Sequence, residues 1–192
     1  MASSPTRLGQ SQRREELTPM AHQALLLRFR DLVTEPGGNI AEHRRIMRLR
    51  GYVWWGWWAR GRQEVTPRSV FQDFFGPDRA PAEVILFDRG LLRLYRTTAS
   101  KVIVAPTDFG VNSPEFEATP AYYVRGRYPA WFRLEGDIAP IEGTSVTVVA
   151  RPTTDKNFVT LDPEATGDVV PLEDLQNETP TLWVIASPST KE

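Results

Sequence analysis

Four tryptophans stand within five residues of this chain, at positions 54, 55, 57 and 58 of the segment that runs from Gly51 to Trp58. Tryptophan side chains are large and mostly apolar, and a buried indole N–H normally needs a hydrogen-bond partner. Such a run must be covered either by the core of the domain or by a flat or cationic ligand. The sequence therefore predicts a domain with an aromatic centre and leaves these two interpretations open.

The length of 192 residues predicts one domain with tails. Residues 1–22 are rich in Ser, Arg, Gln, Glu and Pro and are predicted to form a disordered tail. Residues 23–190 are expected to form a single α+β domain. The chain has no cysteine, which fits a reducing compartment, and its apolar runs are shorter than the ~20 residues of a membrane helix. A cytoplasmic protein with no membrane contact is the expectation.

The pattern of apolar residues predicts one early helix followed mostly by β-strands. Asn39, with Glu42 three residues later, is typical of a capping box, and Gly51 stands where a helix C-cap belongs. A second, short helix is expected over 68–75. Strands are expected over 24–33, 52–58, 83–88, 91–96, 101–105, 130–134, 145–150 and 181–186. The fold class is α+β, mostly β: a small curved sheet or partly open barrel with one capped basic helix.

The two ends of the chain differ in charge. Residues 1–62 hold 11 basic and 5 acidic side chains, whereas residues 135–192 hold 3 basic and 11 acidic ones. Residues 151–180 carry acidic and turn-forming residues, and we expect a long connection there. This asymmetry indicates either two solvated ends or a polar interaction surface.

Catalytic and metal-binding templates are mostly missing from the sequence. It has two histidines, His22 and His43, and neither has further ligands at the spacing of a zinc site. It contains no phosphate-binding loop, dinucleotide fingerprint or nucleophile elbow. We therefore expect no metal, no cofactor and no catalytic residues, and favour a binding protein over an enzyme.

Strand alternation divides the tryptophan run into two faces. Trp55 and Trp57 share a face that we assign to the core. Trp54 and Trp58 share the other face and flank Gly56, which leaves a gap that either admits a planar ring or lets another part of the fold approach closely. Arg60 and Arg62 follow directly and are candidates to bind phosphate.

A second aromatic and basic stretch contains Tyr122, Tyr123, Arg125 and Arg127. Aromatic rings beside arginines are the components that stack and neutralise single-stranded nucleic acid. The alternative is a loop whose tyrosines pack against the core.

The segments 52–58, 84–95 and 122–134 together resemble the PUA-like group of small β-barrels, in particular modules of the EVE type. That resemblance covers roughly residues 24–150. It implies a domain that binds RNA or a modified base in an aromatic pocket between the sheet and a helix, with Trp54 or Trp58 as pocket walls.

The sequence thus predicts a non-catalytic module that binds or senses a nucleobase, as a free nucleotide or within single-stranded or modified nucleic acid. Its candidate ligand-binding residues are Trp54, Trp58, Arg60, Arg62, Tyr122, Tyr123, Arg125 and Arg127. The alternative is a protein–protein adaptor domain of a bacterial multi-component system, in which the tryptophans are structural.

Overall fold

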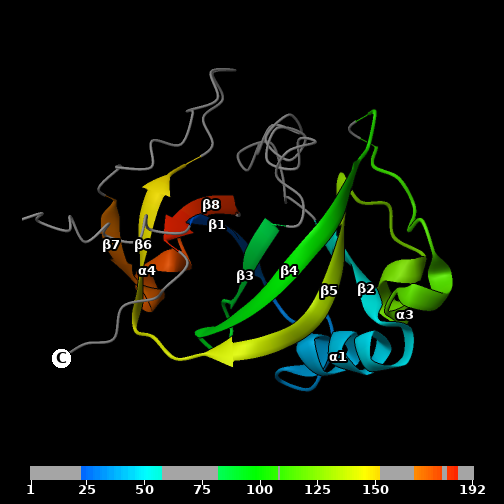
Figure 1. The fold of residues 1–192 in the computed structure, drawn as a ribbon, viewed down its shortest axis with the longest axis horizontal. Helices are drawn as coiled ribbons and strands as arrows, with labels where there is room; N and C mark the ends of the chain where they lie inside the picture. Colours follow the sequence, from blue (N-terminus) through cyan, green and yellow to red (C-terminus); the bar gives the residue numbers. More distant parts are fainter. Residues whose placement is uncertain (1–22, 58–81, 108, 152–166, 179–180, 186–192) are drawn as a thin grey trace, which may run out of the picture.

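The computed structural model describes residues 23–57, 82–107, 109–151, 167–178 and 181–185. Within these ranges the chain forms one eight-stranded β-sheet with helices beside it (Figure 1). The strands are β1 (Gln23–Phe29), β2 (Tyr52–Trp57), β3 (Ala82–Asp88), β4 (Arg93–Val104), β5 (Ala130–Ile141), β6 (Ser145–Ala150), β7 (Asp168–Pro171) and β8 (Thr181–Ile185). The helices are α1 (Gly38–Arg50), the 3₁₀ turn η1 (Phe116–Ala118), α3 (Ala121–Val124) and α4 (Leu172–Leu175).

The described strands follow the order β2-β5-β4-β3-β1-β8-β6-β7 in a single sheet. β1 runs parallel to β3 and antiparallel to β8, and the other pairings are antiparallel. Because β2 and β7 stand at opposite ends of this order and do not pair with each other, the sheet remains open. The predicted α+β, mostly β fold with a curved sheet is confirmed.

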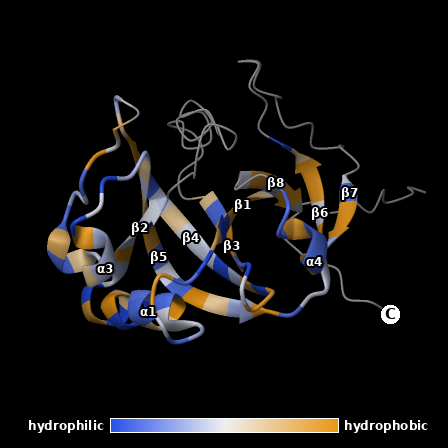
Figure 2. Ribbon diagram, turned by 180° about the vertical axis from the view of Figure 1, so that it is seen from behind, coloured by the Kyte–Doolittle hydropathy of each residue, from blue (hydrophilic) through white to orange (hydrophobic). Residues whose placement is uncertain are grey.

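Two apolar cores form on opposite faces of the sheet, and this explains why three consecutive leucines of β1 are all buried. Leu25 and Leu27 belong to the core that α1 covers, together with Trp55 and Trp57. Leu26 belongs to the second core, to which β6, β7, β8 and α4 contribute their apolar side chains. Figure 2 shows the hydrophobic character of β6 and β7 beside this second core.

Helix α1 confirms the predicted basic helix and its C-cap, but its beginning differs from the prediction. The N-cap is Gly37 in a left-handed conformation, and Asn39 lies inside the helix. Asp31 replaces the capping box: its carboxylate accepts hydrogen bonds from the backbone N–H of Gly37 at 2.6 Å and of Asn39 at 3.1 Å. Glu42 does not turn back to the helix start, because it binds Arg45 at 2.8 Å.

The segment expected as a long acidic connection, 151–180, contains more structure than the sequence indicated. Strand β7 pairs with β6, and α4 places Leu172 and Leu175 in the second core. Since only a few apolar residues mark these short elements, hydrophobic periodicity could not reveal them. The helix expected over 68–75 lies outside the described residues. None of the helices in the described ranges is long and apolar enough to span a membrane.

Candidate aromatic binding site

Strand β2 places the tryptophans on two faces of the sheet, as alternation predicts. Trp55 and Trp57 are buried in the core under α1, which confirms their assignment. Trp54 points to the other face and is 4% exposed. There it belongs to a cluster that also contains Ala118, Tyr123 and Trp131, which we call the Trp54 cluster.

The gap that the sequence places beside Gly56 is filled by the protein itself. A Cβ atom at Gly56 would lie 3.1 Å from the ring of Tyr128 and 3.1 Å from the ring of Trp131. Two aromatic rings thus pass close to this part of the backbone, and a larger residue would fit only if these rings shift. The interpretation of Gly56 as a point of close approach is the one that the described residues support. Trp58, the other flank of the expected gap, lies outside them.

The four-residue helix α3 joins the aromatic side chains of both faces. β2 is the end strand of the sheet, and Tyr123 of α3 contacts Trp55 on one face at 6.4 Å and Trp131 on the other at 6.0 Å between ring centroids. Tyr123 also contacts Tyr128 at 5.1 Å. Helix α3 therefore lies across the outer edge of β2 (Figure 1).

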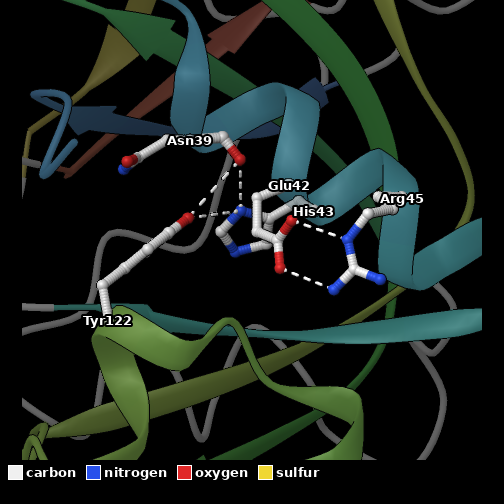
Figure 3. A network of polar contacts seen from close by, with 5 residues as sticks. All are labelled: Asn39, Glu42, His43, Arg45 and Tyr122. Carbon is white, nitrogen blue, oxygen red and sulfur yellow. Dashed lines mark hydrogen bonds and ion pairs between the residues drawn. The ribbon is translucent and has the colours of Figure 1, made fainter. Parts of the chain in front are cut away.

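His43 of α1 lies among the rings of Trp55, Tyr122 and Tyr123, and we call these side chains, with the adjoining Trp54 cluster, the aromatic layer. It is fully buried, with its ring 4.4 Å from Trp55 and 5.6 Å from Tyr123. Its Nδ1 lies 2.7 Å from the backbone carbonyl of Asn39 and 3.1 Å from the Tyr122 hydroxyl (Figure 3). Because a carbonyl oxygen can only accept, the short contact assigns the proton to Nδ1. Nε2 then carries a lone pair.

Burial keeps His43 neutral and leaves polar atoms inside the aromatic layer. Desolvation by burial lowers the pKa of His43 to about 4. The hydrogen bond to Asn39 and the charge of Glu42 act in the opposite direction, but their effect on the pKa is smaller. His43 Nε2 and Trp54 Nε1 are buried and have no hydrogen-bond partner among the described residues. Most buried polar groups are hydrogen-bonded, so an acceptor and a donor left in this state mark a candidate site.

The predicted arginines do not all reach this layer. Arg125 and Arg127 are exposed and follow α3 directly. Arg127 donates from Nε and from one terminal nitrogen to the carbonyl of Gly110, at 3.2 and 2.9 Å. Arg60 and Arg62 lie outside the described residues. The structure thus brings Tyr122 and Tyr123 to the Trp54 cluster and leaves Arg125 and Arg127 on the surface beside it.

Sequence reasoning did not select His43 as a site residue, because it searched for metal ligands. The available signal was helical spacing: Ile40, His43, Ile46 and Met47 recur every three or four residues and form the buried stripe of α1. The expectation of no metal site remains a prediction. Within the described part of the chain, no three metal-ligating side chains come together.

A family model described as Pua-like matches residues 25–192 of the chain. No curated protein and no solved structure matches the chain.

Proposed function

The chain belongs to the Pua-like family, and from this premise we propose that it is a non-catalytic module that binds a nucleobase of RNA, DNA or a free nucleotide. The site is the aromatic layer between α1, β2 and α3, with Trp54, Tyr122 and Tyr123 as the predicted contact residues. Arg125 and Arg127 would meet phosphate, as would Arg60 and Arg62, and Trp58 would be a further stacking residue.

One observation carries the proposal: the layer holds a buried acceptor, His43 Nε2, and a buried donor, Trp54 Nε1, both without partners among the described residues. Tyr123 connects the two, because it contacts the His43 ring and shares a cluster with Trp54. A nucleobase is flat and carries donors and acceptors around its rim. At the edge of β2 it would bond to His43 Nε2 on one face of the sheet or to Trp54 Nε1 on the other, while its own faces pack on aromatic rings.

Access to the layer would require α3 to move, since Tyr123 is 3% exposed in this closed arrangement. Helix α3 is short and makes its covering contacts through the rings of Tyr122 and Tyr123. We propose that it is the part that yields to a ligand, whereas α1 and the sheet stay in place.

The test is tryptophan fluorescence and calorimetry with a panel of nucleotides and short oligonucleotides. We expect quenching in the parent protein and weaker binding with Trp54→Phe, which keeps a ring but removes the indole N–H. The matched control is Trp57→Phe on the opposite face of the same strand, which should bind as the parent does. A panel without any response, or equal losses in the two variants, would contradict the proposal.

An adaptor role is the second candidate, and one observation favours it. Leu49 of α1 and Phe116 of η1 are 71% and 58% exposed, on two elements that contact each other. Arg50 and Glu117 form an ion pair at 2.6 Å between the same elements. If this surface binds a protein, binding should weaken with Leu49→Ser, weaken with salt, and be unaffected by Trp54→Phe.

A further inference from the structure

Phe109 is the most exposed large apolar side chain among the described residues, at 83%. It lies between β4 and η1, a stretch that the sequence analysis did not select. A single exposed hydrophobic residue is ordinary on a protein surface. What distinguishes Phe109 is the backbone next to it and the charges around it.

The backbone that follows Phe109 is held by several independent contacts. Gly110 adopts a φ of 68°, and a Cβ atom there would lie 2.8 Å from the backbone of Tyr128. Val111 and Tyr128 exchange two hydrogen bonds, at 3.0 and 2.9 Å. The indole of Trp131 donates to the Val111 carbonyl at 2.9 Å. The backbone of Gly110 and Val111 is therefore held in place, and the ring of Phe109 is exposed next to it.

Arg127 lies beside this backbone, Arg125 stands two residues before it in the chain, and neither has an acidic partner among the described residues. Arg127 binds the carbonyl of Gly110, the neighbour of Phe109, through Nε and one terminal nitrogen, which leaves its other terminal nitrogen free to donate. Arg125 is exposed at the end of α3. The guanidinium of Arg127, which the Gly110 carbonyl holds in place, is pre-organised to bind phosphate oxygens.

We propose that Phe109, Arg125 and Arg127 form a platform for single-stranded nucleic acid, in which Phe109 stacks a base and the arginines bind the backbone phosphates. An exposed aromatic ring beside unpaired positive charge is complementary to an unstacked base and its phosphate. The platform adjoins the aromatic layer, because Tyr128 contacts Tyr123 and the backbone at Gly110.

This inference rests on the proposed function and narrows it. A nucleotide on the platform would neighbour the one in the aromatic layer, so the ligand would be a strand and not a free nucleotide. Phe109 is then a stacking residue, and its loss should weaken strands while leaving mononucleotides unaffected.

The test measures fluorescence anisotropy of labelled single-stranded RNA and DNA of about ten nucleotides, a length within the site sizes of single-strand-binding folds. Phe109→Ala should weaken binding roughly 5- to 150-fold, the range of one lost base stack. Phe109→Trp should restore it. Phe116→Ala removes another exposed phenylalanine from η1 and should bind as the parent does.

A salt titration tests the arginines separately. Each lost phosphate contact should lower the slope of log K against log salt by about 0.7 for a single strand. Arg125→Gln and Arg127→Gln should each show this reduction, and Arg48→Gln, an exposed arginine of α1, should not.

The outcomes separate the two proposals. Parental affinity for strands in Phe109→Ala, or the same loss in Phe116→Ala, would overturn the platform even if mononucleotides still quench Trp54. Loss of the mononucleotide response in Trp54→Phe, with no effect of Phe109→Ala on strands, would support the aromatic layer and overturn the platform. Absence of any strand binding by the parent protein would also overturn the platform, and the mononucleotide titration would then decide the proposed function by itself.

Discussion

At the scale of single residues, His43 should make the stability of the domain depend on pH. Its pKa is lowered to about 4 in the folded protein, against 6.5 for an unperturbed histidine. As the pH falls, the unfolded chain therefore takes up the proton first, and this favours unfolding. Stability should decrease from about pH 6.5 to about pH 4, by roughly 1.4 kcal/mol for each unit of pKa difference.

Urea unfolding at a series of pH values measures this effect. His43→Phe keeps an aromatic ring against Trp55 but cannot titrate, so its free energy of unfolding should change less with pH over that window. His22→Gln removes the only other histidine and should retain the parental pH dependence. Parallel curves for the parent protein and His43→Phe would show that His43 is not held neutral by burial.

At the scale of elements, the beginning of α1 offers a direct comparison between two capping schemes. Asp31 accepts hydrogen bonds from two backbone N–H groups at the helix start, whereas Glu42 forms a surface ion pair with Arg45. We expect Asp31→Ala to lower the free energy of unfolding by about 1–2 kcal/mol, as loss of an N-cap does. Glu42→Ala should cost less than about 0.5 kcal/mol.

Chemical denaturation of the two variants measures the difference, and Asp31→Asn refines it because an amide oxygen can still accept one of the two hydrogen bonds. Its stability should fall between those of the parent protein and Asp31→Ala. A larger loss from Glu42→Ala than from Asp31→Ala would instead support the capping box that the sequence suggests.

The same helix shows how far local patterns predict this fold. Gly51, the basic character of α1 and the strand 145–150 follow from spacing and turn chemistry, and the structure contains them. The capping box predicted from Asn39 and Glu42 is wrong, because Asp31, seven residues before the helix, reaches the helix N-terminus from the preceding loop. Contacts of that kind depend on tertiary structure, which periodicity does not encode.

In the candidate site, too, some features follow from local sequence patterns and others depend on tertiary contacts. Alternation along β2 correctly separated Trp54 from Trp55 and Trp57, because it is a property of one strand. The covering of Gly56 by Tyr128 and Trp131 requires β5 to pair with β2 and the segment before it to fold back over the strand. No local feature of the sequence specified that return, so the openness of the Trp54 face could not be predicted.

At the scale of the whole molecule, the order of the strands makes the C-terminal part of the chain essential to the sheet. β8 lies between β1 and β6, although these three strands are far apart in sequence. Arg28 of β1 further donates to the backbone carbonyls of Gln176 and Glu178, just before β8. The last described strand of the chain therefore connects β6 and β7 to the rest of the sheet.

A chain that ends after Glu178 should consequently lose cooperative folding. The truncation exposes the edges of β1 and β6 and removes Leu182 and Val184, each worth about 1.5–3 kcal/mol of burial, from the second core. Domains of this kind are stable by only about 5–15 kcal/mol. A chain that begins at Gln23 should by contrast unfold as the parent does, if residues 1–22 form the tail that their composition predicts. Circular dichroism during thermal unfolding distinguishes the two: a sigmoidal transition in the chain that ends after Glu178 would show that β8 is dispensable, against the sheet order observed.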